Sequence, residues 1–187
     1  MNSQLTFPKL PINGSFVHPE AGAEPRWYAV YTRYRHEKAV HDELLSKNVE
    51  TFLPLREVMS RWKDRIQRVH VPLFPGYVFV HADVRRRKLD IVKVPGVARI
   101  VGFNSYPEPI PDHEMEAIRV FLNTTIRYDP YPYLTVGKPV EIQRGPLQGL
   151  QGIVVRRKGR FKFILSVHLI RQSVALEIDA CEIESRV

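Results

Sequence analysis

Apolar and aromatic residues gather in short runs that predict the strands of a folded core. β-Branched and aromatic side chains favour a pleated, half-buried surface, so such runs indicate strands. The runs in the first part of the chain are Trp27–Thr32, Thr51–Leu55, Leu73–Val80 and Val97–Val101. The first is apolar on both faces, which is typical of a central strand, whereas Pro54 favours an edge position for the second.

Helical spacing of apolar residues predicts three helices between and after these strands. They are expected over His36–Lys47, over Val84–Val92 and over a segment that follows Asp112. Asp83 and Asp112 can each cap a helix with a side-chain oxygen. Met115, Ile118 and Leu122 then share one apolar face of the last helix.

The last part of the chain changes to a period of two, which predicts further strands. In Phe161–Ile170 and in Val174–Cys181, every second residue is apolar, and the residues between them form a second, mixed series. Lys158-Gly159 fits the turn of a hairpin. Several short strands separated by turn signals indicate a small β-barrel.

The predicted fold class is α+β, with an N-terminal α/β sandwich whose sheet is mainly antiparallel and a small C-terminal β-barrel. We expect the sandwich over residues 26–124 and the barrel over residues 135–187. Residues 1–25 hold four prolines and two glycines and are expected to form a flexible tail. Residues 125–134 hold two spaced prolines and are expected to form an extended linker.

Composition narrows the class of protein. The 187 residues carry a formal net charge of +8 and 44% hydrophobic residues, which allows a real core and suggests a polyanionic partner such as nucleic acid. A basic protein that is merely soluble would carry the same charge. Cys181 is the only cysteine, so no intrachain disulfide can form, which fits a reducing cytoplasm. No apolar run reaches the roughly 20 residues of a membrane helix, and residues 1–26 lack the apolar core of a signal peptide.

No convergent set of catalytic residues stands out in the sequence. His36 and His41 resemble the pair of a zinc-protease helix, but a spacing of five places them about 140° apart rather than on one face. Gly145, Gly149 and Gly152 follow neither phosphate-cradling pattern and suit tight turns. We therefore predict a protein that is not an enzyme and that uses no metal and no cofactor.

Three groups of basic residues are candidate contacts for nucleic acid or for an acidic protein. The first opens the second predicted helix, where each cation is locally unfavourable by about 0.3–1 kcal/mol. The second lies between two predicted strands, in a projecting hairpin or loop, with a tryptophan that could stack on bases. Each group can instead be a solvated run of charge. The groups are Arg85–Lys88; Arg61, Lys63, Arg65 and Arg68 around Trp62; and Arg156, Arg157, Lys158, Arg160 and Lys162.

Two ordered sets of motifs resemble those of the NusG family of transcription elongation factors. The first set consists of Trp27–Tyr31, Pro72–Val80 and Pro95–Val97. The second set, Val136–Ile142 and Gly145–Val154, is similar to a KOW domain. The resemblance covers residues 26–187 and implies a polymerase-binding N-terminal domain followed by a KOW-type barrel.

The resemblance implies contacts with RNA polymerase and with DNA. In the family, an apolar depression binds the clamp helices of the polymerase, and a basic element touches its gate loop. Bridging the cleft in this way would favour the closed clamp and suppress pausing. A further position lies near the non-template DNA strand. The matching residues are Tyr77, Phe79, Phe103 and Met115 for the clamp helices, Arg87 and Lys88 for the gate loop, and Arg33 for the DNA.

The motif Pro72–Val80 is more similar to specialised paralogues such as RfaH and UpxY, which act on particular operons. General members contact Rho or the ribosome through a Phe-Gly pair in a barrel loop, where this chain has Ile170-Arg171. Contact with those partners therefore does not follow from the resemblance, which again favours a specialist. RfaH-like relatives can fold this domain as helices, whereas the alternation in this chain indicates a barrel.

These patterns together predict an operon-specific elongation or antitermination factor that binds RNA polymerase and suppresses pausing or termination. A ribosome-associated KOW protein that binds RNA is the alternative, because KOW barrels occur in ribosomal proteins and basic hairpins suit ribosomal RNA. The N-terminal motif set favours the elongation factor. No membrane partner is expected.

Overall fold

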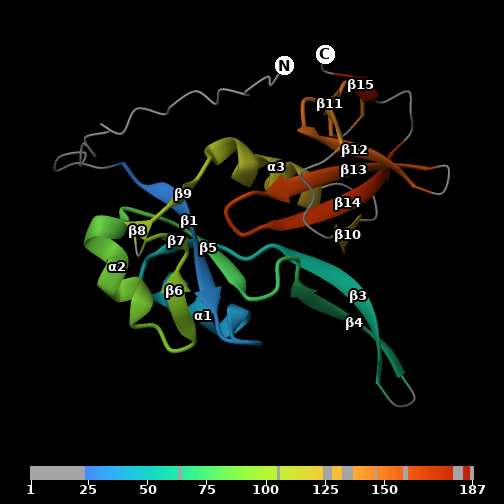
Figure 1. Ribbon diagram of the computed structural model, residues 1–187. Coiled ribbons are helices and arrows are strands. Elements are labelled where there is room, and N and C mark those ends of the chain that lie inside the picture. Colours follow the sequence, from blue (N-terminus) through green and yellow to red (C-terminus); the bar gives the residue numbers. More distant parts are fainter. Residues whose placement is uncertain are drawn as a thin grey trace, which may run out of the picture.

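The predicted α+β fold class is confirmed by a mixed architecture of mainly antiparallel sheets (Figure 1). The computed structural model describes residues 24–62, 65–104, 106–123, 128–131, 137–145, 147–157, 160–178 and 183–185. Most of the predicted tail, residues 1–23, lies outside the described residues.

The first sheet is built around a central strand. Its order is β2-β5-β1-β6, with β9 also paired to β1, and every pairing is antiparallel. The strands are β1 (Arg26–Thr32), β2 (Glu50–Phe52), β5 (Tyr77–Ala82), β6 (Val97–Ile100) and β9 (Pro109–Ile110). The central place of β1 and the edge place of β2 are as predicted, because a strand apolar on both faces needs cover on both.

Two of the predicted strands have different limits in the structure. The strand expected over Thr51–Leu55 is divided, because β2 ends at Phe52 and Leu55 already belongs to the next strand. The strand expected over Leu73–Val80 begins only at Tyr77, and the residues before it form a turn. Local apolar character predicted these strands, but the prolines at positions 54 and 75 interrupt them.

Three helices are present in the described part of the chain: α1 (Glu37–Ser46), α2 (Val84–Val92) and α3 (Asp112–Leu122). Asp83 caps α2 as predicted, since its Oδ1 accepts a hydrogen bond from the Arg85 N–H at 3.1 Å. The predicted cap of α3 is wrong by one residue. Pro111 holds the N-cap position, and Asp112 is the first helical residue, where its negative charge favours the helix dipole.

Two antiparallel hairpins extend from the first sheet region. The long one joins β3 (Leu55–Trp62) to β4 (Arg65–Pro72), and the short one joins β7 (Gly102–Phe103) to β8 (Tyr106–Pro107). The long hairpin contains the second basic group, as the sequence predicted, and Figure 1 shows it projecting away from both large sheets.

The C-terminal part is a six-stranded antiparallel sheet with the order β10-β14-β13-β12-β11-β15. The strands are β10 (Tyr128–Tyr131), β11 (Lys138–Ile142), β12 (Gln151–Arg157), β13 (Arg160–Val167), β14 (Gln172–Ile178) and β15 (Ile183–Ser185). Strand β10 lies inside the segment expected to be a linker and pairs with β14. The predicted turn at Lys158-Gly159 lies outside the described residues, although β12 and β13 on either side of it pair antiparallel.

The helices cover opposite faces of the first sheet. Val30 and Val78 belong to a core cluster that contains buried residues of α1 and α2. Ala29 and Phe79, the neighbours of these residues in the same strands, belong to a second cluster with α3. Alternation of side chains along β1 and β5 therefore separates the two cores.

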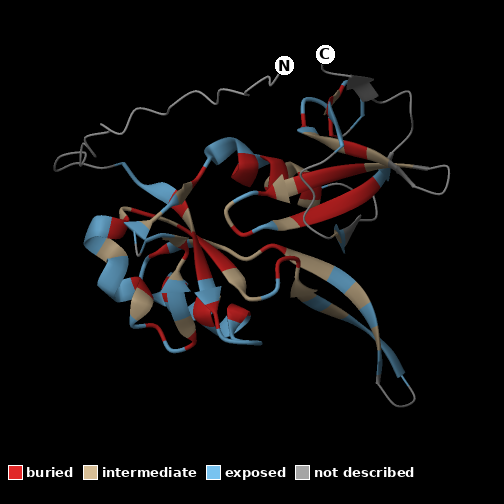
Figure 2. Ribbon diagram, in the orientation of Figure 1, coloured by how far each residue is buried: buried red, intermediate tan, exposed pale blue. Residues whose placement is uncertain are grey.

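Helix α3 also packs against the C-terminal sheet. The core cluster that contains the buried residues of α3 continues into Phe163 and Leu165 of β13. Figure 1 shows α3 beside that strand. Ile164 and Ala175, which point to the other face of the C-terminal sheet, are also buried (0% and 5% exposed). The C-terminal sheet is therefore covered on both faces around β13, and burial concentrates where α3 meets it (Figure 2).

Among the described residues, no helix is both long enough and apolar enough to cross a membrane.

Replacing Phe163 by alanine should lower the free energy of unfolding by about 3–5 kcal/mol, because the ring is fully buried and leaves a cavity. Urea denaturation followed by circular dichroism measures this change. Phe103→Ala is the matched control, since the Phe103 side chain is 72% exposed and should change stability by less than about 0.5 kcal/mol. Equal effects of the two variants would contradict the assignment of Phe163 to the core.

Candidate functional site

The turn that precedes Tyr77 is held by backbone and side-chain contacts. The Gly76 N–H donates to Oε1 of Glu37 at 2.8 Å, and the Thr32 N–H donates to the Gly76 carbonyl at 2.8 Å. Gly76 has a φ of +83°, and a Cβ there would lie 3.2 Å from the ring of Tyr31. Only glycine adopts this backbone conformation without strain, so the turn holds Tyr77 in place at the start of β5.

Tyr77 lies half-buried beside another aromatic residue. Its ring centroid is 5.3 Å from that of Tyr31, and the guanidinium of Arg99 lies 5.6 Å from the Tyr31 ring. Burial raises the pKa of Tyr77, the nearby Tyr31 raises it further, and Arg99 opposes the shift. The hydroxyl of Tyr77 is therefore held in its neutral form, as a hydrogen-bonding group on an aromatic surface.

The four residues predicted to form an apolar depression lie in different environments. Phe79 and Met115 are buried in the core between the first sheet and α3 (0% and 1% exposed). Tyr77 packs against the same core from its border. Phe103 is 72% exposed on the β7–β8 hairpin, opposite Tyr106, which is 71% exposed. The aromatic surface that a partner can reach in this arrangement is therefore the pair Phe103 and Tyr106.

Arg87 and Lys88 on α2 also differ in their surroundings. The Arg87 Nη2 donates to the Lys47 carbonyl at 2.5 Å, and its Nε forms an ion pair with Asp90 at 2.9 Å without the alignment of a hydrogen bond. Arg87 thus ties α2 to the turn after α1. Lys88 is exposed and forms no ion pair with another described residue.

Arg33 stands at the end of β1 in an exposed loop. Its N–H donates to the Gly96 carbonyl at 2.8 Å, which holds the loop against the turn before β6. The next residues are Tyr34, which is 77% exposed, and Arg35, whose guanidinium lies 5.1 Å from the Tyr34 ring. An exposed aromatic ring between two arginines is suited to stack on a base while the cations contact phosphates.

Arg61 and Arg65 lie at the outer end of the β3–β4 hairpin. Both are exposed, and the hairpin carries them away from the two large sheets (Figure 2). The tryptophan of this group, Trp62, belongs to β3, but its side chain lies outside the described residues. In the third basic group, only Lys162 has a described side chain, and its Nζ lies 5.9 Å from the Tyr131 ring.

Ile170 and Arg171 occupy the turn between β13 and β14. Ile170 is only 6% exposed and belongs to the core, whereas Arg171 is exposed with a φ of 51°. The turn lies close to α3, because the His168 N–H donates to Oε2 of Glu114 at 3.3 Å. A cleft of about 520 Å³ lies between α3 and the C-terminal sheet beside this contact. Its lining includes His113, Glu114 and His168.

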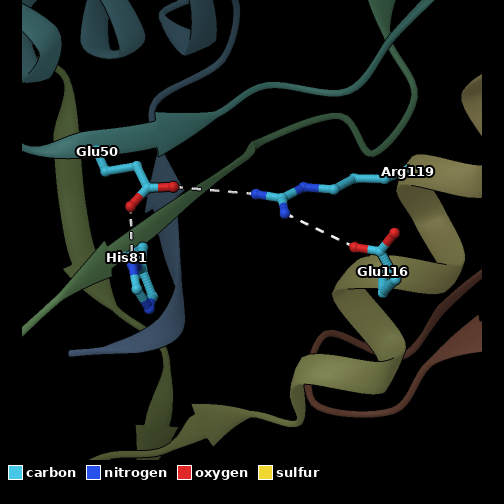
Figure 3. A network of polar contacts seen from close by, with 4 residues as sticks. All are labelled: Glu50, His81, Glu116 and Arg119. Atoms are coloured by element: carbon cyan, nitrogen blue, oxygen red, sulfur yellow. Dashed lines mark hydrogen bonds and ion pairs between the residues drawn. The ribbon is translucent and has the colours of Figure 1, made fainter. Parts of the chain in front are cut away.

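Sequence reasoning missed a polar network that joins α3 to the first sheet (Figure 3). Glu50 of β2 contacts His81 Nδ1 at 2.8 Å and Arg119 of α3 at 4.0 Å. Arg119 also pairs with Glu116 at 3.7 Å and lies 4.9 Å from the Trp27 ring. The residues come from three distant segments, so no local signal in the sequence could have indicated them.

The structure offers no sign of metal chemistry within its described residues. No group of three or more His, Cys, Asp and Glu side chains there could hold a metal ion. His36 and His41 turn to separate partners, since His36 Nδ1 lies 2.9 Å from the Tyr34 carbonyl and His41 Nδ1 lies 2.7 Å from the Thr51 hydroxyl. The described surface does present several exposed aromatic and basic side chains, among them Tyr34, Phe103 and Arg61.

Comparison with known proteins agrees with this arrangement. Residues 25–119 match the family model described as NusG, transcription termination factor nusG. The transcription termination/antitermination protein NusG of Lactococcus lactis is 26% identical over 171 residues, which cover 84% of this chain and 91% of that protein. The protein of the same name from Helicobacter pylori strain J99 is 24% identical over 184 residues, with 84% and 97% covered.

A solved structure from a study of domain interaction in Thermotoga maritima NusG has a similar fold. The TM-score is 0.54 at 22% sequence identity, and the match covers 88% of this chain and 98% of that one. This likeness supports the fold.

Replacing Glu37 by alanine should destabilise the protein by about 1–3 kcal/mol, because the Gly76 N–H loses its acceptor in a partly buried position. Glu37→Gln is the control, since its amide oxygen can still accept the bond. Urea denaturation of the two variants measures the difference. If both variants lose the same stability, the hydrogen bond to Gly76 does not hold the turn.

Stability should fall as the pH rises above about 10, the ordinary tyrosine pKa, because Tyr77 and Tyr28 both have a raised pKa in the folded protein. The contribution is fully present below pH 10 and is lost as the pH approaches the folded pKa. Tyr77→Phe should weaken this dependence. Urea denaturation at pH 9 and pH 11 checks it, and an unchanged pH dependence in Tyr77→Phe would contradict the prediction.

Proposed function

Because this chain belongs to the NusG family of transcription termination and antitermination factors, we propose that it binds RNA polymerase during elongation and suppresses pausing or termination. The family match over residues 25–119 carries the proposal. The exposed aromatic residues of the β7–β8 hairpin support it, because large exposed rings are typical of protein interfaces.

The proposed contact with the polymerase clamp centres on Phe103 and includes Tyr77. Both residues offer aromatic area at a modest cost in side-chain entropy. Phe79 and Met115 are buried, so in this arrangement they support the surface from beneath. A contact between the polymerase and Met115 itself would require α3 to move away from its neighbours.

The proposed contact with the gate loop belongs to Lys88, with Arg87 in a positioning role. The Lys88 ammonium is exposed and available to an acidic partner, whereas Arg87 already contacts the Lys47 carbonyl and Asp90. Contacts on both sides of the polymerase cleft would stabilise its closed state and shorten pauses.

The proposed contact with the non-template DNA strand belongs to Arg33 and its neighbour Tyr34. The loop is anchored by the hydrogen bond to Gly96, so Tyr34 and Arg35 are presented on a rigid support. Stacking of a base on an exposed aromatic ring contributes about 1–3 kcal/mol and tolerates any sequence.

We propose the division predicted from the sequence, with a polymerase-binding domain over residues 26–124 and a KOW domain over residues 135–187. Within the C-terminal turn, Arg171 is the residue that a partner can reach, because Ile170 lies in the core. Without the Phe-Gly pair of general members, this surface favours a specialised factor that acts on particular operons.

The proposal is tested by binding of the full chain to reconstituted RNA polymerase elongation complexes, with pause lifetimes followed in the same samples. Phe103→Ala should weaken binding at least tenfold, because an exposed ring at the centre of an interface is a hot spot. Lys88→Glu should retain most of the affinity but lose pause suppression. Lys138→Glu, an exposed charge reversal in the C-terminal sheet, is the control.

The proposal fails if the wild-type chain neither binds elongation complexes nor changes their pausing. If the chain binds and shortens pauses but Phe103→Ala behaves as wild type, the residue assignment is wrong and the function stands. The melting temperature of each variant shows whether a loss comes from unfolding.

A further inference from the structure

The β3–β4 hairpin is a long ribbon with little burial. Each strand has eight residues, so the ribbon extends roughly 26 Å from its base at a rise of about 3.3 Å per residue. Met59 and Ile66 are 63% and 66% exposed. Figures 1 and 2 show the two strands projecting away from the rest of the protein, and none of their described side chains is buried.

The register of the hairpin places an arginine on each of its two faces. Arg61 is paired with Ile66, and both side chains point to one face. Arg65 is paired with Trp62, one position farther along, and therefore points to the opposite face. The outer end of the ribbon is thus positively charged on both sides.

These two arginines are not neutralised within the described structure. Arg68, nearer the base, forms an ion pair with Glu57 at 3.5 Å. Arg61 and Arg65 are exposed and form no ion pair with another described residue. Among the described residues of the hairpin, the arginines without an ion-pair partner therefore lie toward its outer end.

We propose that the outer end of this hairpin inserts into the major groove of duplex DNA, with Arg61 and Arg65 contacting the phosphates on the two walls. The major groove is about 12 Å wide and admits a two-stranded β-ribbon. The depth of the groove, about 8.5 Å, corresponds to the last two or three residues of β3 and the first two or three of β4. Those residues include Ile66, which can contact a thymine methyl group, and Gln67, whose amide can reach base edges.

The distribution of charge favours this partner over others. An acidic protein surface would meet one face of the ribbon and leave the arginine on the other face unpaired, whereas a groove offers phosphates on both sides. The major groove of duplex RNA is too deep and narrow for the ribbon to enter. A single strand has no two walls to contact. The inference uses residues that the proposed polymerase contacts do not, so it can be tested without polymerase.

The test measures binding of the full chain to a fluorescent 24-base-pair DNA duplex by anisotropy across a series of salt concentrations. The competitors are an RNA duplex and a single DNA strand of the same sequence. The double variant Arg61→Glu/Arg65→Glu should bind the DNA duplex at least tenfold more weakly. The salt dependence of binding, log K against log salt, should lose about two units of slope.

Matched controls separate this effect from total charge and from folding. Lys138→Glu/Arg144→Glu makes the same charge change at two exposed positions outside the hairpin and should stay within about threefold of wild type, because screened distant charges matter little. Arg61→Gln/Arg65→Gln removes the charges without reversing them and should show an intermediate loss. Melting temperatures should be the same for all four proteins.

Methylation of guanine N7 by dimethyl sulfate reports on the groove, because N7 faces the major groove. Wild-type protein should protect guanines in the bound duplex, and Arg61→Glu/Arg65→Glu should not. Three outcomes would overturn the proposal: duplex binding that is unchanged in Arg61→Glu/Arg65→Glu, tighter binding of the RNA duplex or the single strand through the same arginines, and bound duplex whose N7 atoms stay fully reactive.

Discussion

Helix α3 is the element on which the arrangement of this protein depends. Met115, Ile118 and Phe121 are fully buried and share one face of the helix, whereas Asp112, His113 and Glu116 are exposed. A helix with such an apolar face must bury it against neighbouring layers. Here it covers one face of the first sheet and contacts the C-terminal sheet on its other side. The only buried carboxylate of its first turn, that of Glu114, accepts the backbone N–H of His168.

This layering decides which surfaces remain for partners. The face of β5 that carries Phe79 is covered by α3, so Phe79 acts as core, whereas Tyr77 on the same face lies at the border of that core. Partners can instead reach peripheral features, among them the β3–β4 hairpin, the β7–β8 hairpin, the outer side of α2 and the loop of Arg33 and Tyr34. Each is attached to a rigid element, so a contact there can form without rearrangement of the cores. Surfaces of this kind suit binding with a small entropic cost.

Local signals explain what the sequence predicted well. Strand β1 follows from its apolar run, the cap of α2 follows from Asp83, and the projecting hairpin follows from a polar, basic segment between two strands. The features that sequence reasoning missed depend on long-range contacts. Ile164 and Ala175 belong to the alternate series of their strands, and their burial depends on contacts that form only in the folded protein.

Dependence on long-range contacts also limits how well the sequence predicts the candidate site. Family motifs indicated Phe79 and Met115 as contact residues, but motif position carries no information on which layer covers a side chain, and both are buried. Arg87 was indicated as a contact of the gate loop, yet its contacts with the Lys47 carbonyl and Asp90 are known only from the folded structure. Pairing in space, rather than residue type, separates a structural arginine from an available one.

The distinction between paired and unpaired cations also shows which part of the net charge of +8 a partner can reach. Near the first core, Arg119 is paired and stacked, since it lies between Glu50, Glu116 and Trp27. A charge close to apolar layers needs such partners, because its desolvation is otherwise costly. Unpaired cations such as Arg61 and Lys88 stand at the periphery, where water solvates them until a partner arrives. The projecting elements therefore contribute to the positive field that steers a polyanion toward the protein.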